Sequence, residues 1–325
     1  MILAGDIGGT KTHLALYERG GTPRAPACGR RLASRDYSSL ESLVQAFLAG
    51  AGQRAERAVI GVAGPIVGDR VEATNLPWQV EAPRLSALLG GAQVRLMNDL
   101  ETTAWGLAEL GDGELETLHA GTALPGNRAL IAAGTGLGEA LVIWDGRTWR
   151  PSASEGGHAD FAPRDEVEDE LLGWLRARHG RVSYERVLSG RGLADLYRFL
   201  SETGRGAASE AVARRFAAAE DPAAVVTDAA LDGSCERARL ALERFASVYG
   251  AEAGNLALKA LAVNGVYLGG GIAPRILPFL RSGAFQRAFA AKGRLGPVLE
   301  RIPVRLILDD RAALWGAAAV ALQDE

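Results

Sequence analysis

The sequence predicts an α/β protein with two domains. Apolar segments of strand length alternate with segments of helical periodicity, which is typical of the α/β class. The chain has 325 residues, which is too long for one ordinary hydrophobic core and sufficient for two. A strand-turn-strand unit with a glycine- and threonine-rich turn occurs twice, about the length of a small domain apart, and this suggests an internally duplicated fold with one copy in each domain.

The first third of the chain opens with a predicted hairpin. Ile2–Ile7 is a short apolar run that ends at Gly8-Gly9-Thr10, and His13–Tyr17 is a second apolar run. The further elements expected here are a helix over 40–48, strands over 58–62 and 94–97, and a helix that follows Asn98-Asp99 and continues to Leu110.

The second hairpin follows a loop-like stretch, rich in glycine and threonine, over 115–126. It consists of Ala129–Ala133, the turn Gly134-Thr135-Gly136-Leu137-Gly138 and Ala140–Trp144. The pattern is almost wholly helical from 165 to 262. The elements expected after it are strands over 263–268 and 304–308 and a helix over 311–322, which could return to the first domain.

Composition and charge point to a small-molecule enzyme in the cytoplasm. The net charge of −3 and the pI of about 5.9 offer no basic surface for nucleic acid or for an anionic membrane. Cys28 and Cys235 are the only cysteines, which excludes a disulfide framework and a cysteine zinc cluster. No apolar run approaches the ~20 residues that span a bilayer, and no basic segment precedes the first apolar run.

Three glycine turns follow predicted strands, at Gly8-Gly9-Thr10, at Gly134-Thr135-Gly136 and at Gly269-Gly270-Gly271. Taken alone, Gly8-Gly9-Thr10 is more often an ordinary turn than a phosphate site, and each of the other two could also be an ordinary turn. Their common position suits two domains that hold the phosphates of one nucleotide, because glycine lets backbone N–H groups approach an anion closely. The first turn is not a Walker A loop, since Thr10 precedes Lys11, and the second does not have the spacing of a dinucleotide fingerprint.

Asn98-Asp99 could supply either a base or a helix cap. A carboxylate at the carboxyl end of a strand lies where α/β proteins bind ligands, whereas both residue types also cap helices well.

Glu155-Gly156-Gly157-His158 could direct a carboxylate and an imidazole at one ligand, which suits sugar hydroxyls. Taken alone, such a motif is more often a surface loop than a site, and with four histidines at no paired spacing a zinc site is disfavoured. Glu185 falls in the first turn of a short helix that Ser183 could cap, where a favourable interaction with the helix dipole is the simpler interpretation.

Taken together, these motifs resemble the bacterial ATP-dependent glucokinase family over nearly the whole chain. The resemblance rests on seven segments in the family's order: Gly5-Asp6-Ile7-Gly8-Gly9-Thr10, Ala73-Thr74-Asn75-Leu76-Pro77-Trp78, Asn98-Asp99, Gly134-Thr135-Gly136-Leu137-Gly138, Glu155-Gly156-Gly157-His158, Glu185-Arg186-Val187-Leu188-Ser189-Gly190 and Gly269-Gly270-Gly271-Ile272-Ala273-Pro274-Arg275. The chain departs from the family at Lys11, where relatives often have Asn, and it lacks the cysteine-rich zinc loop of the related repressor and sugar kinase group.

The resemblance implies a two-domain hexokinase/actin-like (ribonuclease H-like) fold. The small α/β domain would contain residues 1–110 plus 304–325, the larger helix-rich α/β domain would contain residues 111–303, and the sugar would bind in the cleft between them. The resemblance further implies a homodimer, ATP as co-substrate and Mg²⁺ as cofactor.

The resemblance also implies a role for each matching residue. Asp99 resembles the catalytic base, and Asp6 resembles the residue that orients hydrated Mg²⁺. The remaining positions fall into three groups: Asn98, Glu155, His158 and Glu185, with Thr74 and Asn75 beside them, at the sugar; Gly8, Gly9, Thr10, Gly134, Thr135 and Gly136 at the phosphates; and Gly270 and Gly271 under the adenosine.

The predicted function is therefore the ATP-dependent phosphorylation of D-glucose to glucose 6-phosphate. A kinase for mannose, fructose or an N-acetyl hexosamine is the alternative among enzymes. A nucleotide-gated, actin-like protein without catalysis is the alternative from another class, and the presence of Asn98-Asp99 together with Glu155 and His158 disfavours it.

Overall fold

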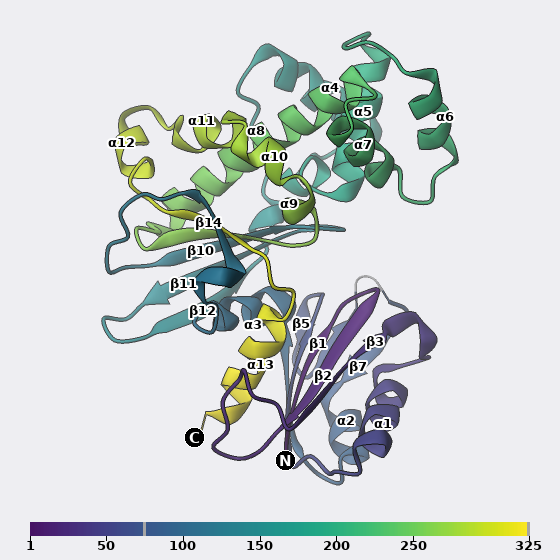
Figure 1. Cartoon of the computed structure of the whole chain (residues 1–325), viewed down its shortest axis with the longest axis vertical. Coiled ribbons are helices and arrows are strands. Elements are labelled where there is room, and N and C mark those ends of the chain that lie inside the picture. The colour runs from purple at the N-terminus through teal and green to yellow at the C-terminus, as the bar shows by residue number, and fades with distance from the viewer. Residues whose placement is uncertain (74–75, 324–325) are drawn as a thin grey trace. The chain divides into compact units, whose positions relative to one another are not determined.

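The structure of this chain is a computed structural model that describes residues 1–73 and 76–323. It divides into two compact units. Unit 1 contains Met1–Leu115, Arg150–Ala153 and Asp309–Glu325, and unit 2 contains Glu116–Trp149 and Ser154–Leu308 (Figure 1). Each unit has a mixed sheet flanked by helices, so the predicted α/β class is confirmed.

The main sheet of unit 1 has five strands in the order β3-β2-β1-β4-β8. β1 (Ile2–Ile7) pairs antiparallel with β2 (Lys11–Tyr17) and parallel with β4 (Arg57–Val62). β4 in turn pairs parallel with β8 (Gln93–Asn98), while β3 (Cys28–Ala33) lies antiparallel to β2. Because β1, β4 and β8 are parallel, their carboxyl ends lie at one edge of the sheet.

Helices cover both faces of this sheet. On one face Leu43 and Phe47 of α1 (Leu40–Ala51) join the core that contains Leu3 and Ile60. On the other face lie α3 and α13, whose side of the core includes Ala4, Val59, Met97, Leu314 and Ala317 (Figure 1). The bounds of the further elements of unit 1 are β5 (Ile66–Val67), β6 (Arg70–Glu72), β7 (Gln79–Glu81), α2 (Ala82–Leu88), α3 (Asp99–Gly106), α13 (Ala312–Leu322), and the 3-10 helices η1 (Ser34–Asp36) and η2 (Asp112–Glu114).

The helices α3 and α13 touch backbone to backbone through two glycines. A Cβ atom built at Gly316 would lie 1.7 Å from the carbonyl oxygen of Thr102, and one at Gly106 would lie 1.9 Å from that of Ala312. The α3 helix begins at Asp99, so this contact also fixes the position of that residue.

We expect Gly316→Ala to destabilise unit 1 by about 2–3 kcal/mol, because a methyl group in a closed backbone contact forces the helices apart. Denaturant unfolding would measure the change. The matched control is Gly173→Ala in α4 (Glu166–His179), where an added Cβ has no neighbour within 4 Å. This control should be neutral or stabilising by about 0.5–1 kcal/mol, since alanine favours helix. Equal unfolding midpoints for the two variants would contradict the packing argument.

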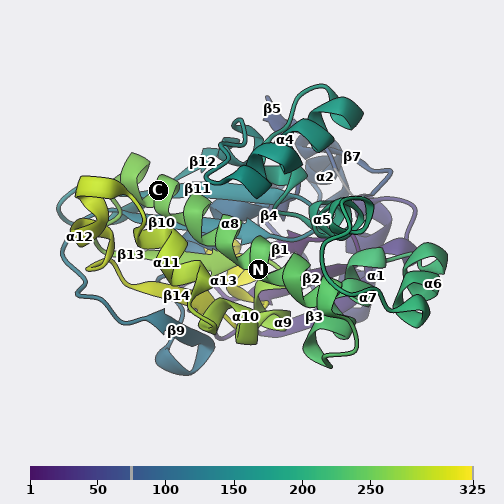
Figure 2. The same cartoon turned by 90° about the horizontal axis from the view of Figure 1, so that it is seen from above.

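The second main sheet has six strands in the order β12-β11-β10-β13-β14-β9, and unit 2 contains β10, β11, β13 and β14 whole. Its long helix α8 (Glu236–Ala260) packs against β10 and α11, with the backbone of Gly250 against the carbonyl of Phe285 (Figure 2). The bounds of the remaining elements are β9 (Leu115–His119), β10 (Arg128–Ala133), β11 (Leu137–Trp144), β12 (Trp149–Ser154), β13 (Gly265–Gly269), β14 (Val304–Ile307), α5 (Gly190–Glu202), α6 (Glu210–Ala218), α7 (Pro222–Leu231), α9 (Ile272–Arg275), α10 (Leu277–Arg281), α11 (Ala284–Ala290), α12 (Gly296–Leu299), η3 (Gly156–His158), η4 (Tyr184–Arg186) and η5 (Gly293–Leu295).

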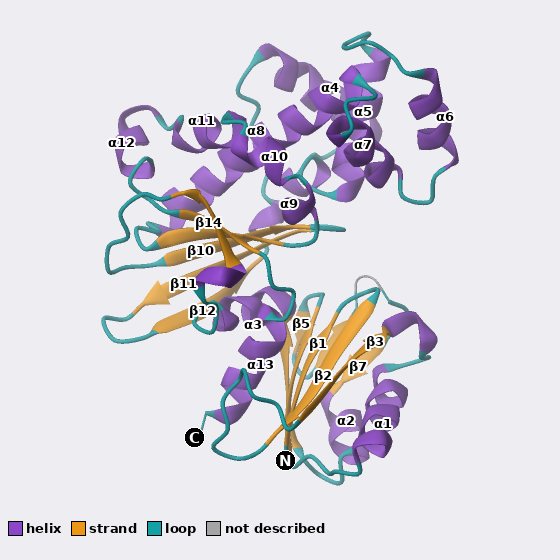
Figure 3. Ribbon diagram, in the orientation of Figure 1, coloured by secondary structure: helices purple, strands orange, loops and turns teal. Residues whose placement is uncertain are grey.

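The two hairpins occupy equivalent places in their sheets. β10 pairs antiparallel with β11 and parallel with β13, just as β1 pairs with β2 and β4 (Figure 3). The internal repeat suggested by the two glycine turns therefore has a counterpart in strand topology.

Some expected element positions were wrong, among them the helix expected to continue to Leu110, which ends at Gly106. The stretch over 115–126 is not all loop, because Leu115–His119 forms β9 at the edge of the second sheet. The strand expected over 263–268 begins two residues later, since Leu261 ends α8 in the left-handed conformation and delays it. The predicted boundary at 304 assigns β14 to the small domain, whereas Val304 and Leu306 pair with β13 in unit 2.

Candidate active site

Unit 1 gathers polar groups at the carboxyl ends of its parallel strands. Asp6 is the penultimate residue of β1, and Asn98 is the last residue of β8. β4 lies between β1 and β8, and its Gly61 pairs with Asp6 on one side and with Met97, the residue before Asn98, on the other. A Cβ at Gly61 would lie 2.6 Å from the hydroxyl oxygen of Thr102, so this glycine lets α3 approach the sheet where Asp6 lies.

Asn98 is the N-cap of α3. Its side-chain oxygen accepts the N–H of Leu100 at 2.9 Å, and its Nδ2 donates to the carbonyl of Gly64 at 3.4 Å. Asp99 is the first helical residue, and its Oδ1 accepts the same N–H of Leu100 at 3.0 Å. The cap interpretation is therefore correct for Asn98, and the helix has this cap independently of the carboxylate of Asp99.

Asp6 is a buried acid with two other acidic side chains, Asp99 and Asp310, nearby. Burial raises its pKa to about 7, with a smaller contribution in the same direction from the carboxylates of Asp99 and Asp310. Asp310 also pairs with Arg31, whose Nη2 is 3.0 Å from the Asp310 carboxylate. A cation brought to this edge of the sheet would relieve the repulsion among the three acids.

Hydrogen bonds accepted by backbone carbonyl groups hold the turn after β1 in place. The N–H of Gly8 donates to the Lys11 carbonyl at 2.9 Å, which closes the turn. Ser34 supports it from η1, because its hydroxyl donates to the Gly8 carbonyl at 2.7 Å and its N–H donates to the Thr10 carbonyl at 3.1 Å. No sequence pattern points to Ser34, which lies more than twenty residues from the turn.

In unit 2 the other two glycine turns lie against each other. β10 and β13 are parallel neighbours, so the turns that follow them meet at one edge of the sheet. Gly270 has φ +81°, and a Cβ there would lie 2.3 Å from the carbonyl oxygen of Ala133, the residue before Gly134. The turn at Gly134 is closed by its own N–H to the Gly136 carbonyl at 2.8 Å.

We expect Gly270→Ala to destabilise the protein by about 1–3 kcal/mol. An alanine there would be held in a left-handed conformation and would press on the Gly134 turn. Thermal unfolding would measure the loss of stability. Gly271→Ala is the matched control for stability, because a Cβ at Gly271 has no neighbour within 4 Å and its φ is not left-handed. A Gly270→Ala variant as stable as this control would contradict the expected clash.

Glu185 contacts the same edge of the second sheet. Its Oε2 accepts the N–H of Leu137 at 3.0 Å, and a Cβ at Gly136 would lie 2.5 Å from that oxygen. Ser183 is the N-cap residue of η4, but its side chain makes no capping hydrogen bond, so the expected Ser183 cap was wrong. The contact with Leu137 gives Glu185 a role at the glycine turn that the helix-dipole interpretation does not include.

The Glu155–His158 segment is joined to this cluster by backbone contacts. Gly157 is buried, and a Cβ there would lie 2.1 Å from the carbonyl oxygen of Leu137. The N–H of Tyr184 donates to the Ala159 carbonyl at 2.9 Å. The side chains of Glu155 and His158 are exposed, and the nearest ring nitrogen and carboxylate oxygen are 3.9 Å apart. Unit 2 thus presents two exposed polar side chains near Glu185 and the two glycine turns.

Comparison with known proteins identifies the family. The glucokinase family model matches residues 3–324. The chain belongs to the glucokinase family. A glucokinase of a Nostoc species is 40% identical over 337 residues, which cover 99% of this chain and 98% of that protein. The family indicated by the sequence motifs is therefore confirmed.

Solved glucokinase structures have the same fold. The crystal structure of a glucokinase from an Antarctic psychrotroph is 31% identical with a TM-score of 0.83, and the match covers 98% of each chain. A glucokinase from Balamuthia mandrillaris, solved in complex with glucose, is 22% identical with a TM-score of 0.82 and covers 99% of this chain and 93% of that one. An α/β kinase fold follows for the present chain.

The predicted site residues of this glucokinase family member fall into two groups. Unit 1 contains Asp6, Gly8–Thr10, Asn98 and Asp99, and unit 2 contains the rest that the structure describes. Thr74 and Asn75 lie outside the described residues. Among the described residues, no group of three or more His, Cys, Asp or Glu side chains is arranged to hold a metal ion.

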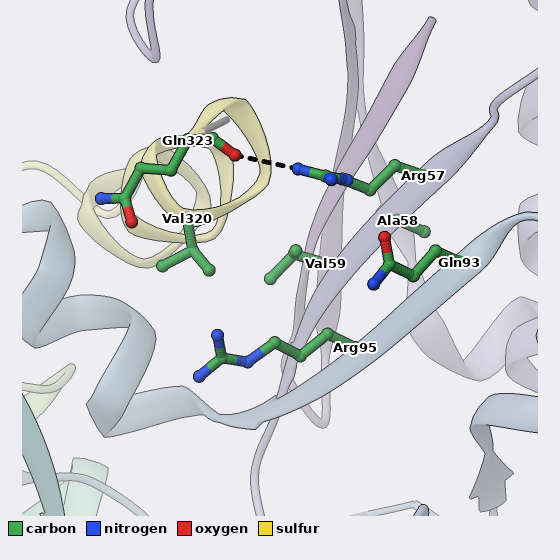
Figure 4. A pocket seen from close by; sticks show the side chains of 7 residues that line it. All are labelled: Arg57, Ala58, Val59, Gln93, Arg95, Val320 and Gln323. Atoms are coloured by element: carbon green, nitrogen blue, oxygen red, sulfur yellow. Dashed lines mark hydrogen bonds between the residues drawn. The ribbon is translucent and has the colours of Figure 1, made fainter. Parts of the chain in front are cut away.

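A pocket of about 150 Å³ lies away from the predicted residues of unit 1. Arg57 and Gln93, the first residues of β4 and β8, line it together with Arg95, and Arg57 donates to the backbone carbonyl of Gln323 at 2.9 Å (Figure 4). Asn98 and Asp6 are at the opposite ends of their strands.

Among the described residues, no helix combines the length and apolar character that spanning a membrane requires.

Proposed function

We propose that this chain transfers the γ-phosphoryl group of ATP to the 6-hydroxyl of glucose, with Asp99 as the general base. The sugar oxygen forms the new bond to phosphorus, the bond from phosphorus to the leaving oxygen of ADP breaks, and the hydroxyl proton passes to the carboxylate of Asp99. The observation that carries the assignment is that Asn98 caps α3, so the carboxylate of Asp99 at the strand end is not needed as the cap.

The sugar would be held by residues of both units. We propose that Asn98 and Asp99 contact it from unit 1, and that Glu155, His158 and Glu185 contact it from unit 2, as in a two-domain hexokinase/actin-like fold with a cleft. Thr74 and Asn75 are proposed beside the sugar from their sequence match alone. Closure over the sugar would exclude water and suppress ATP hydrolysis.

The nucleotide would be held by glycine turns of both units. Backbone N–H groups of Gly8, Gly9 and Thr10, and of Gly134, Thr135 and Gly136, are proposed to stabilise the negative charge that develops on the phosphates. Gly270 and Gly271 would lie under the adenosine, and the close contact between Gly270 and Ala133 supports a common surface for phosphate and nucleoside. Mg²⁺ bound with ATP would neutralise phosphate charge, and Asp6 would hold it through water, which fits the crowd of acids around Asp6.

Oligomeric state, cellular location and further partners are proposed from the family resemblance. A homodimer in the cytoplasm is expected from the family resemblance, and nucleic acid and membranes are not expected as partners.

The test is a coupled ADP-release assay with ATP, run with and without glucose, and repeated with mannose, fructose and N-acetylglucosamine. We expect ADP release to depend on glucose and kcat/KM to be highest for glucose. A bulky acetamide would leave polar groups of the sugar site unpaired, which is costly in a buried site. A higher kcat/KM for another hexose would reassign the substrate. A rate of ADP release that is the same with and without each sugar would refute the kinase function.

A further inference from the structure

Unit 2 contains two buried carboxyl groups without adequate hydrogen bonds. Glu139 of β11 is 2% exposed, and Glu252 of α8 is 0% exposed. Both carboxyl oxygens of Glu139, and Oε1 of Glu252, lack a hydrogen-bond partner among the described residues. Oε2 of Glu252 accepts from Nδ2 of Asn255 at 2.8 Å. Buried polar atoms without partners are costly, so their presence calls for an explanation.

The surroundings of the pair favour one shared proton. Burial, followed by the charge of Glu252, raises the pKa of Glu139 well above its usual range. Lys259, also on α8, opposes this shift, and its Nζ is 3.5 Å from Oε1 of Glu252. A proton held between the two carboxyls would convert orphaned acceptors into a donor and an acceptor, as in other carboxyl pairs.

The other titratable and charged groups around the pair come from η4, from α8 and from segments outside the helices and strands. Tyr184 of η4 and Tyr249 of α8 both have a pKa raised by burial, with Glu252 and Glu139 respectively adding to the effect. Lys292, which follows α11, donates to the Ala251 carbonyl at 2.8 Å, and burial lowers its pKa to about 8. Arg164 acts on Lys292 in the same direction. As the pH rises and Lys292 loses its proton, its positive charge no longer offsets the negative charge of the acid pair.

Glu139 lies directly under the proposed sugar loop. A Cβ atom at Gly156 would be 2.0 Å from Oε2 of Glu139, and the neighbouring Gly157 packs on the carbonyl of Leu137, two residues before Glu139 on the same strand. These two glycines are the residues between Glu155 and His158. Displacement of the Glu139 carboxyl would therefore displace the backbone that carries both proposed sugar ligands.

We propose that Glu139 is a positioning residue for glucose: it shares one proton with Glu252, and this neutralised pair holds the Gly156-Gly157 backbone so that Glu155 and His158 face the sugar. The proposal rests on the proposed function and adds a regulation of that same site. Loss of the shared proton places two negative charges side by side in a closed space, and their repulsion moves the loop.

The experiment compares wild type with Glu139→Gln between pH 6.5 and 9.5. Glutamine has the shape of the protonated acid, donates to Glu252 and cannot ionise. In wild type the KM for glucose should rise several-fold, up to about tenfold, above neutral pH while kcat changes less. In Glu139→Gln the KM should stay level over this range. Glu243→Gln, which changes a half-buried glutamate of α8 paired with Arg239, is the control and should keep the wild-type rise.

A readout without sugar separates this proposal from the kinase function. Hydrogen exchange of a peptide spanning 154–160, corrected for the intrinsic effect of pH, should show protection that falls with pH in wild type and persists in Glu139→Gln. Should Glu139→Gln not fold, Glu252→Gln removes the same pair and should give the same result. An active wild type with pH-independent loop protection, or a Glu139→Gln variant with the wild-type KM rise, would overturn the role of Glu139. An inactive wild type whose loop protection follows Glu139 would instead refute the kinase function alone.

Discussion

Replacing Asp99 with asparagine is expected to lower kcat by about 10²- to 10⁴-fold while glucose binding changes modestly. The amide keeps the size of the side chain and its ability to hydrogen-bond a hydroxyl, but it does not accept the proton that general-base catalysis removes. Helix α3 should remain intact, because Asn98 caps it through the N–H of Leu100. Turnover, calorimetric glucose binding and thermal unfolding, measured on the same preparation, would separate chemistry from binding and folding.

The control for this substitution is Asp112→Asn, which changes an exposed aspartate in the first turn of η2 in the same unit. It should leave turnover and stability as in wild type. A folded Asp99→Asn variant that binds glucose and retains a near-normal kcat would remove Asp99 from the mechanism.

Replacing Asp6 with asparagine is expected to stabilise unit 1 at pH 8 and to impair activity. The pKa of Asp6 is raised from 3.8 to about 7, so the folded state keeps a proton that the unfolded chain has lost. Stability from this group is thus present below about pH 4 and is lost as the pH rises to about 7, by about 1.4 kcal/mol per unit. The uncharged side chain of the Asp6→Asn variant avoids the loss, which gives the variant an advantage of about 2–4 kcal/mol at pH 8.

Denaturant midpoints at pH 4 and pH 8 would measure this advantage, which should be small at the lower pH and large at the higher one. Activity with Mg²⁺ and ATP should fall by about 10- to 100-fold, the effect typical of residues that orient a metal's ligands. Asp69→Asn, in an exposed turn of the same unit, should alter neither quantity. Equal stability of Asp6→Asn and wild type at pH 8 would contradict the raised pKa of the buried Asp6 carboxyl.

Local sequence signals predicted the two hairpins well, but they did not predict the edge strand β9. β1 and β2 lie where the apolar runs and the Gly8-Gly9-Thr10 turn indicate, because an apolar run and a glycine turn are local properties. β9 was missed because its residues, Leu115–His119, gain strand structure only from a place at the edge of a sheet whose other strands are distant in sequence. Tertiary pairing decides such a segment.

The candidate site shows the same division. Motifs brought Asp99, Glu185 and the glycine turns to attention, and they stay predicted functional residues. Glu139 and Glu252 were not found, since each stands in an apolar setting, one on a strand and one on a helix more than a hundred residues later. Only the fold brings the two carboxyl groups near each other and places that of Glu139 against Gly156, and a single sequence contains no periodic or turn signal for these contacts.

The return of α13 to the first sheet sets an order for folding on the ribosome. Ala4, Val59 and Met97 are made early, but the helix that covers them emerges about 200 residues later, roughly 10–40 s at ordinary rates of synthesis. Until then unit 1 displays an open apolar face, whereas unit 2 can complete its own core first. We therefore expect nascent chains to need chaperone protection of that face, and chains that stop before Ala312 to aggregate even with all predicted site residues present.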